Sequence, residues 1–316
     1  MKKFYICLLI IIQIILQSFF GNALYPEAGR EGGVPLIVRD FASFPREQSL
    51  GNSTIALDNS VSVIYFNPAS FVSMNSELIL GSMKLHKDED IYYFAYGTPI
   101  TWFNKSEGEQ SLGILCTRLE SNNIYTTDAF GSITGIASMT EDLAVLSYMR
   151  KLNKLYIGAS INYYHQRLFT YQDSVFDISF GLAGNISSDH KKRFGIVIRN
   201  LAEQSIKINK ISEKIPHDIS LGFAFDFGFN EKSDNITLSI SYTFNDIDDY
   251  YGAGLEYRLR DSIKLRFGIE EGILSGGIGI NYKDLSLDFG CCDLPGSTDY
   301  DSLRSNFLSV SATFKY

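Results

Sequence analysis

Apolar and polar residues alternate strictly over the C-terminal residues of this chain. Alternate residues of a β-strand point to opposite faces, so this segment predicts a strand with one apolar and one polar face. A strand that crosses a membrane in a β-barrel needs one face in lipid and the other in a watery lumen. The apolar face holds Leu308, Val310, Ala312, Phe314 and Tyr316, and the polar face holds Ser309, Ser311, Thr313 and Lys315.

The same alternation recurs through the C-terminal half of the chain. Residues 218–229 place five large apolar side chains on one face, and residues 235–244, 251–259 and 262–270 repeat this pattern. Charged residues fall on the opposite face, which predicts that they point into the lumen. They could line a path, or they could pair across the lumen or bind a plug, because buried charges need partners. These charges are Asp226, Glu256, Arg258, Lys264, Arg266, Glu270 and Asp288.

Further alternating segments bring the total to about fourteen strands and predict an all-β fold, a closed antiparallel barrel. Most of the segments approach the length of about 9 to 11 residues that crosses a bilayer when tilted. Residues 151–154 and 282–284 predict short periplasmic turns, whereas residues 119–139 and 201–217 predict outer loops or excursions. A secreted β-sandwich is the alternative fold. The added segments are 77–86, 90–98, 111–119, 141–151, 154–164, 174–184, 193–200, 275–282, 284–291 and 305–316.

The N-terminal residues 1–23 predict a secretory signal peptide. Lys2 and Lys3 precede an apolar run over residues 4–20, and the small residues Gly21 and Ala23 suit a cleavage site. An uncleaved anchor helix is the alternative, because the run is close to the lower length limit for spanning a bilayer. Export followed by insertion places the chain in the outer membrane, in contact with lipid. The aromatic residues Phe314 and Tyr316 at the C-terminal end predict the signal that the barrel assembly machinery reads.

Composition and motifs argue against several functional classes. The formal net charge is -8 and becomes about -10 without the two lysines of the signal, so nucleic-acid binding has no electrostatic basis. The four histidines, His86, His165, His190 and His217, show no pair at metal-ligand spacing, so no cofactor or metal is expected. A hydrolase motif around a nucleophilic serine is not found, and His165 is the nearest catalytic candidate. We therefore expect a protein that is not an enzyme.

Residues 24–75 precede the first clear strand and predict a plug, the hatch, before a barrel over residues 76–316. A run with small and polar residues at 49–59 is followed by the motif Asn67, Pro68 and Ala69. Proline fixes φ and restricts the residue before it, so the motif suits a rigid bend packed in a lumen, although an ordinary surface turn is the alternative. If the inner charges hold the hatch, neutralising Arg258 and Arg266 together should loosen it.

This stretch resembles the N-terminal hatch of FadL-like outer-membrane transporters and, more closely, that of the PorV/PorQ family. The resemblance continues through residues 142–152, 193–201 and 215–218, and so covers nearly the whole mature chain. It departs at Ser70, where glycine is common, and at Asn59, where a second aspartate is usual.

The resemblance implies a barrel that binds a substrate at the outer membrane and passes it on. The substrate would be a small hydrophobic ligand, as in FadL-like transport, or a secreted protein, as in PorV-like type IX secretion. A structural barrel, or a secreted binding module without a transport role, is the alternative. Fold alone does not decide between these functions. Residues 124–130 come closest to an exposed apolar surface with aromatic anchors for a partner.

Overall fold

The computed structural model describes residues 36–39, 44–57, 60–72, 75–86, 89–100, 109–187, 189, 191–209, 211–228, 234–246, 249–293 and 306–316. All of them belong to one compact unit, Pro35–Gly296 with Leu303–Tyr316. The expected signal peptide and the first part of the expected hatch lie outside the described residues. Within the described ranges, no helix is both long and apolar enough to cross a membrane.

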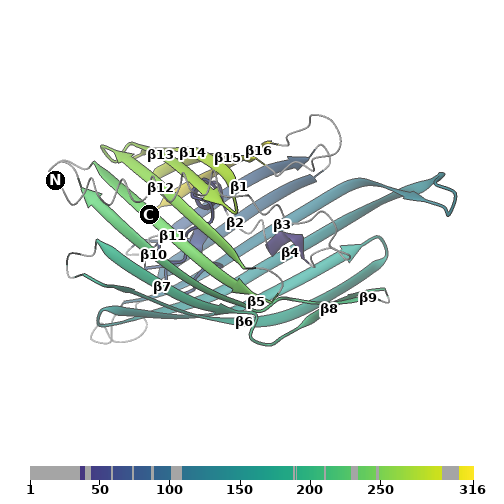
Figure 1. Ribbon diagram of the computed structural model, residues 1–316, viewed down its shortest axis with the longest axis horizontal. Coiled ribbons are helices and arrows are strands. Elements are labelled where there is room, and N and C mark those ends of the chain that lie inside the picture. Colours follow the sequence, from purple (N-terminus) through teal and green to yellow (C-terminus); the bar gives the residue numbers. More distant parts are fainter. Residues whose placement is uncertain are drawn as a thin grey trace. The chain divides into compact units, whose positions relative to one another are not determined.

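Fourteen strands of the described part form one closed antiparallel barrel (Figure 1), which confirms the predicted fold. Each strand pairs with its neighbours along the wall, except that β7 is followed in the wall by β10. The strands are β1 (Glu77–His86), β2 (Glu89–Pro99), β3 (Gln110–Thr127), β4 (Ile133–Leu152), β5 (Leu155–Leu168), β6 (Tyr171–Asn185), β7 (Lys192–Arg199), β10 (Asp218–Gly228), β11 (Asn235–Asn245), β12 (Tyr250–Leu259), β13 (Ile263–Glu270), β14 (Ile273–Tyr282), β15 (Leu285–Asp293) and β16 (Asn306–Lys315).

The C-terminal strand closes the barrel. β16 pairs with β15 on one side and with β1 on the other, in a register that runs from Glu77 opposite Lys315 to Lys84 opposite Leu308. Ser76 and Tyr316 continue this pairing, because each backbone N–H donates to the other's carbonyl, at 3.0 and 3.1 Å. Closure leaves no unpaired strand edge in the lipid, where an unsatisfied backbone group would cost several kcal/mol.

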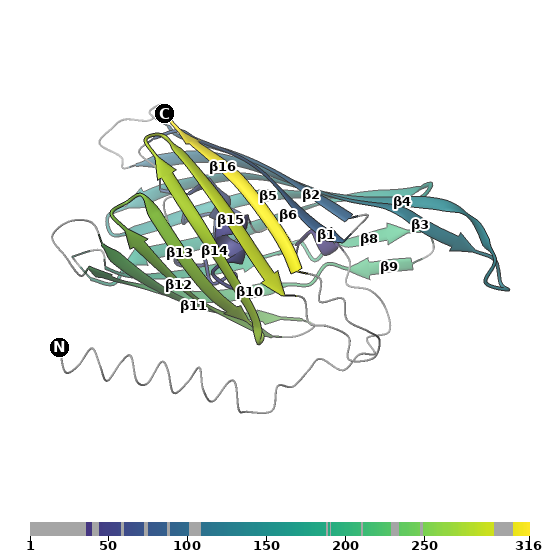
Figure 2. The same ribbon diagram turned by 90° about the horizontal axis from the view of Figure 1, so that it is seen from above.

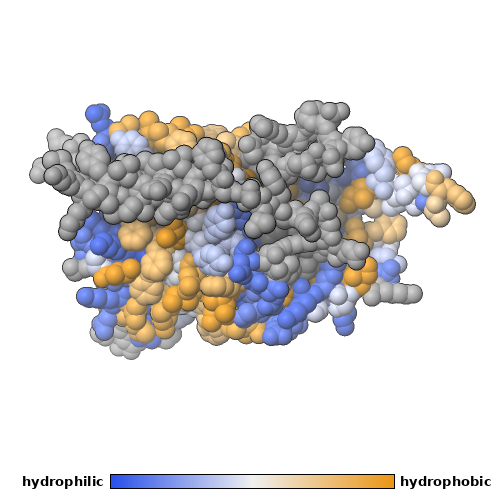
Figure 3. Space-filling model, viewed as in Figure 1, coloured by the Kyte–Doolittle hydropathy of each residue, from blue (hydrophilic) through white to orange (hydrophobic). Residues whose placement is uncertain are grey.

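The strands present apolar side chains outward, as their alternation predicts. On β10, Ile219, Leu221 and Phe223 are exposed on the outer surface, whereas Ser220 and Ala224 are buried on the inner one. β16 follows the same rule, with Leu308 and Val310 outward and Ser309 and Ser311 inward. Figure 3 shows apolar side chains in broad orange areas over the barrel strands. The outer surface is therefore suited to lipid.

The two ends of the barrel differ. The turns at residues 153–154 and 283–284 lie at the end that holds Ser76 and Tyr316, which we call the terminal end. At the other end, the far end, β3 and β4 continue past their neighbours (Figures 1 and 2). β2 pairs with β3 as far as Ser121, and β5 pairs with β4 from Met139 onward. Residues 122–138, beyond these limits, are called the β3–β4 ribbon.

Residues 119–139, expected to form an outer loop or an excursion, form an excursion of two paired strands. β3 and β4 remain paired up to Thr127 opposite Ile133, and Asp128 organises the turn by accepting hydrogen bonds from the N–H groups of Phe130 and Ser132. The alternation of the strands breaks at a register shift between Ser121 and Ile124, which hides the continuing strand from a period-two search.

The excursion over residues 200–217 also contains strands, because β8 (Ser205–Ile208) and β9 (Ile211–Lys214) form a small hairpin. β6 pairs with β7 over Phe180–Asn185, so the excursion adjoins the remaining edge of β6. Leu201 N–H donates to the Ile178 carbonyl, and Lys207 N–H donates to the Asp173 carboxylate. We call residues 200–217 the flap.

Candidate functional site

The described part of the hatch lies inside the barrel, where most of its residues are buried (Figure 2). It comprises residues 36–39, 44–57 and 60–72 and contains three short helical elements, η1 (Ile37–Arg39), α2 (Pro45–Gln48) and η2 (Val61–Val63). Pro45 suits the first position of α2 because proline has no N–H to leave unpaired there. The Ser60 hydroxyl accepts the Ser62 N–H and so caps η2.

A belt of paired glycines on the inner wall seats the hatch. At each of these glycines, a Cβ atom would contact an atom of hatch residues 45–71 closely or overlap with it. Each pair joins neighbouring strands in register, so the wall loses its side chains at the places where the hatch backbone passes. The pairs are Gly97 with Gly113, Gly158 with Gly181, Gly195 with Gly222, Gly254 with Gly268, and Gly277 with Gly290.

The Asn67, Pro68 and Ala69 motif packs on one of these pairs. A Cβ at Gly158 would overlap with the Pro68 carbonyl group, and a Cβ at Gly181 would meet the Asn67 side chain. The Asn67 side chain accepts the Ala69 N–H at 3.0 Å and donates to the Ile55 carbonyl at 2.9 Å. It also donates to the Leu182 carbonyl of β6 at 3.3 Å. Asn67 therefore ties two passes of the hatch to each other and to the wall.

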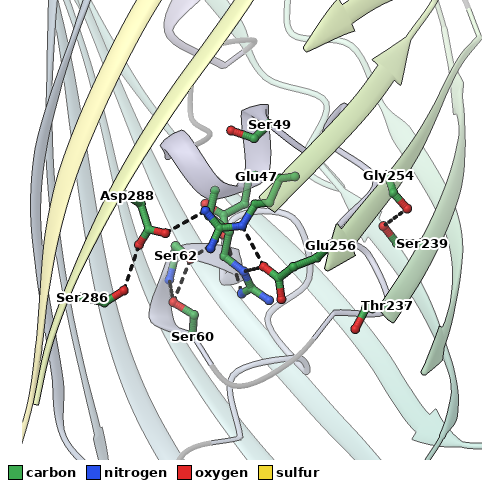
Figure 4. A network of polar contacts seen from close by, with 12 residues as sticks. Glu47, Ser49, Ser60, Ser62, Thr237, Ser239, Gly254, Glu256, Ser286 and Asp288 are labelled. Carbon is green, nitrogen blue, oxygen red and sulfur yellow. Dashed lines mark hydrogen bonds and ion pairs between the residues drawn. The ribbon is translucent and has the colours of Figure 1, made fainter. Parts of the chain in front are cut away.

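A buried ion network joins α2 to the wall formed by β12, β13 and β15. Arg266 Nε lies 2.7 Å from Glu256 Oε2, and Arg266 Nη1 lies 2.7 Å from Asp288 Oδ1. Arg46 of the hatch reaches the same Glu256 carboxylate at 3.6 Å. Figure 4 shows Glu256 and Asp288 pointing into this network from opposite sides, with Glu47 between them. Burial raises the pKa of Glu47, although the Ser62 hydroxyl donates to it at 2.8 Å.

A second ion cluster holds the start of the described hatch near the far end. Arg39 Nη2 lies 2.8 Å from Asp218 Oδ2, and Arg199 Nε lies 3.3 Å from the same oxygen. Asn245 donates to the other Asp218 oxygen at 2.6 Å. One residue earlier in the hatch, Val38 N–H donates to the Glu141 carboxylate of β4 at 2.8 Å. Sequence reasoning missed these partners, because Arg39 and Asp218 are 179 positions apart.

The other charges expected in the lumen have different partners. Asn52 of the hatch donates to Glu270 at 2.7 Å, which adds a contact between hatch and wall. Asp226 accepts from Arg193 on the neighbouring wall strand β7, at 3.0 Å, and Arg258 pairs with Asp261 of the following turn at 3.7 Å. Lys264 is partly buried on the inner face of β13. Of the pair Arg258 and Arg266, it is thus Arg266 that shares a partner with the hatch.

The lumen has two unlike walls. The inner face of β1–β6, the apolar wall, carries the wall residues of one buried hydrophobic cluster with the hatch and the flap, beside buried polar residues such as Asn162 and Asp177. The inner face of β10–β16, the polar wall, carries serine, threonine, glycine and the other charges. This division is the feature that the sequence analysis did not detect. The cluster contains Ile79, Met83, Leu85, Ile91, Tyr93, Ala95, Leu115, Leu119, Leu143, Val145, Tyr164 and Val175 of the wall, Leu36, Val38, Phe44, Val61, Ile64, Tyr65 and Phe71 of the hatch, and Ile206 and Ile215 of the flap.

A small hollow with room for about one water molecule lies between the hatch and the wall near the terminal end. Ala56, Ala69 and Ser70 line it from the hatch, and Tyr156 and Arg193 line it from β5 and β7. Toward the far end, residues of the hatch, the apolar wall and the flap are buried together in the apolar cluster.

The remaining candidates from the sequence lie away from the lumen. His165 lies on the outer side of β5, where its Nδ1 is 2.8 Å from the Ser174 hydroxyl and its ring stacks near Tyr163. Phe314 and Tyr316 are exposed on the outer side at the terminal end. Among the described residues, no group of three histidine, cysteine or acidic residues could hold a metal ion. The side chains of His86 and His190 lie outside the described part.

Comparison with protein-family models and with curated proteins finds no match. Solved structures do match. The Pseudomonas putida toluene transporter TodX is 12% identical, with a TM-score of 0.57, and the match covers 85% of this chain and 96% of that one. A Pseudomonas aeruginosa FadL homologue is 10% identical, with a TM-score of 0.57 and coverage of 86% and 98%.

The chain has the FadL/TodX-like barrel fold. A TodX mutant lacking S2, described as a monoaromatic hydrocarbon channel, supports this at 9% identity, with a TM-score of 0.53 and coverage of 87% and 98%. This fold is that of an outer-membrane β-barrel, which agrees with the apolar outer surface and the expected location. The structural similarity confirms the FadL-like part of the resemblance that the sequence suggested, at the level of the fold. The closer resemblance to the PorV/PorQ family stays a prediction.

Proposed function

We propose that this barrel is a gated, non-enzymatic passage for small hydrophobic compounds across the outer membrane, with the hatch as its gate. The observation that carries the proposal is the apolar wall. These apolar side chains pack against the hatch when it is seated, and an apolar solute would be stabilised by leaving water for them when the hatch moves. The lining extends from Leu85 and Leu119 near the far end to hatch residues that block it.

The polar wall holds the hatch through charged and polar contacts. Arg46 and Asn52 hold the hatch to Glu256 and Glu270, while the apolar side chains of the hatch face the other wall. Breaking a buried ion pair costs about 3 to 5 kcal/mol when the freed charge stays dry. Water that enters on the polar wall would hydrate those charges and reduce this cost. We infer that the gate opens when water reaches the polar wall and the hatch leaves it there.

The similar structures support this proposal through their stated substrates. TodX is described as a toluene transporter, and its mutant as a monoaromatic hydrocarbon channel. At their low identity they show the fold alone, so a monoaromatic compound is a reasonable first probe and not an assignment.

A reversible lock tests whether the hatch must move. The hydroxyls of Ser53 in the hatch and Ser239 in β11 lie 2.6 Å apart. Replacing both by cysteine, in a background where Cys116, Cys291 and Cys292 are serine, allows a disulfide between hatch and wall. We expect radiolabelled toluene uptake by intact cells to fall to the level of cells without the barrel under oxidising conditions, and to recover with a reductant.

The matched control is a disulfide that leaves the hatch free. Ser220 and Thr243 belong to the neighbouring strands β10 and β11, and their hydroxyls lie 2.8 Å apart. Cysteines at these positions should leave uptake unchanged under both conditions.

Continued uptake through a verified Ser53–Ser239 lock would contradict the gating proposal. Equal uptake by cells with and without the wild-type barrel would contradict transport, and would favour the PorV-like alternative of a closed barrel that hands on secreted proteins.

A further inference from the structure

The β3–β4 ribbon carries large apolar side chains that stay exposed beyond the described strands of the barrel and the described part of the hatch. Tyr125 and Ile136 face each other across the ribbon and are 62% and 59% exposed. Ile133 is 65% exposed, and Phe130 in the turn is 94% exposed. Figure 3 shows orange residues on the projecting tip. Scattered exposed apolar residues are ordinary on a protein surface, but here four of them lie on one short two-stranded ribbon.

The ribbon lies beyond the membrane, so lipid does not account for these side chains. Below it, the outer surface of the barrel turns from apolar to charged. Lys84 pairs with Asp90 at 2.8 Å, and Arg118 pairs with Asp142 at 2.6 Å, all on the outer face of β1–β4. Charged pairs of this kind mark the end of the lipid-facing band, because charge on a lipid face is destabilising. The ribbon therefore projects into water at the far end.

Both long edges of the ribbon are open. In the described part of the chain, no strand pairs with the outer edges of residues 124–127 and 133–137. Exposed edges present unpaired N–H and C=O groups, and proteins commonly protect them with lysine or proline. Residues 121–139 contain neither, nor any arginine. Isolated two-stranded hairpins are also marginally stable in water, so a third strand would stabilise the ribbon.

The charge around the ribbon selects the kind of strand that fits. Asp128 is exposed in the turn, and Glu89 and Glu120 stand at the base, where the ribbon leaves the barrel and where Glu120 lies 3.9 Å from Arg118. No lysine, arginine or histidine occurs in residues 119–142. An added strand with basic residues at its ends would meet acidic groups at both ends of the ribbon, and its apolar residues would pack on Tyr125 and Ile136.

We propose that the β3–β4 ribbon is a docking site for an extended segment of another polypeptide, with alternating apolar residues and basic ends, which adds as a third strand. Main-chain hydrogen bonds to the open edge supply affinity, and the apolar side chains and the acidic residues supply specificity. The segment belongs to a protein outside the barrel. This site is separate from the lumen and does not depend on the proposed transport.

A synthetic strand tests this proposal on the full-length protein in detergent. The probe is a fluorescein-labelled peptide of alternating valine and threonine with lysines at both ends, and binding is followed by fluorescence anisotropy. We expect the double variant Tyr125→Ser with Ile136→Ser to bind the probe at least about tenfold more weakly, as loss of central apolar anchors does in other interfaces. Heat-modifiable gel mobility verifies that the variant is folded.

Three controls separate strand addition from adhesion. Phe169→Ser removes another apolar side chain, 58% exposed at the same end of the barrel, and should leave binding unchanged. A probe with alternate amides N-methylated should bind weakly, because it cannot complete the edge. A probe with glutamates in place of the lysines should also bind weakly, and higher salt should weaken binding of the lysine probe.

No binding by the wild type, or equal binding by the double variant or the methylated probe, would overturn the proposal. A wild-type dimer that the double variant makes monomeric, without probe binding, would identify a second copy as the occupant instead.

Discussion

Single residues hold the hatch through close backbone approach as much as through charge. The paired glycines remove side chains from the wall where the hatch chain passes, and Asn67 satisfies carbonyls on both sides of that contact. Water can hydrate a charged wall residue that loses its hatch partner. A Cβ added at one of these glycines would instead meet or overlap with atoms of the hatch. The seat therefore sets the position of the hatch more strictly than the ion pairs do.

Gly158 offers the sharpest residue-scale test. Gly158→Ala places a Cβ against the Pro68 and Ala69 backbone, which cannot move as a flexible side chain would. Overpacking of this kind costs about 1 to 3 kcal/mol, so the ratio of seated to displaced hatch should fall about tenfold. Planar-bilayer recordings should show more frequent openings. The control is Gly228→Ala on β10, where no atom lies within 4 Å of the added Cβ, and this variant should behave as the wild type. Openings of equal frequency in both variants would contradict the claim that the glycine pairs position the hatch.

At the scale of elements, the flap and the ribbon show how strands extend past the membrane on one side of the barrel. The flap packs Ile206 and Ile215 against the apolar wall and is anchored at its base. His217 N–H donates to the Asp246 carboxylate at 3.2 Å, and Lys214 Nζ lies 3.5 Å from it. The hydrogen bond from His217 N–H has the largest effect, and together with Lys214 it holds the pKa of Asp246 below its ordinary value.

The anchor makes the flap sensitive to acid. The pKa of Asp246 is lower in the anchored state than in a free aspartate. The carboxylate therefore stabilises the anchored flap fully above the pKa of a free aspartate, and this stabilisation is lost as the pH falls through the lowered pKa. Asp246→Asn should speed amide hydrogen exchange in residues 205–214 several-fold at neutral pH and remove the acid dependence. Asp234→Asn changes a carboxylate that accepts Arg260 N–H at the terminal end, and exchange in the flap should not respond to it. An unchanged flap in Asp246→Asn would show that its apolar packing and its hydrogen bonds to β6 hold it without this anchor.

For the whole molecule, the closed wall and the filled lumen are separable. Closure depends on strand pairing between β1 and β16, whereas filling depends on the hatch. Without the hatch, the charges of the polar wall would face water, where they need no partner. We expect the barrel to keep its heat-modifiable mobility when residues 24–75 are deleted, and to conduct in planar bilayers where the full chain is silent. A folded but silent deletion variant would show that the flap or another segment also blocks the lumen.

The sequence by itself determined the strands of the barrel and the orientation of their faces. Alternation along a strand reports which residues meet lipid, and this information is local, as in residues 218–227 and 308–316. The even count of strands and the motif Asn67, Pro68 and Ala69 were likewise visible. The ribbon was hidden because the bulge after Ser121 interrupts its period.

Only the tertiary structure decided which residues meet across the lumen. Arg39 with Asp218, Arg46 with Glu256, and the seating of the hatch on the glycine pairs are contacts between segments that lie far apart in the sequence. The division into an apolar and a polar wall also appears only when the barrel is closed, because inward residues acquire a common environment from strands far apart in sequence. Alternation along one strand records only which of its faces meets lipid and which faces the lumen. The contacts of the hatch depend on which residues of other strands lie opposite it.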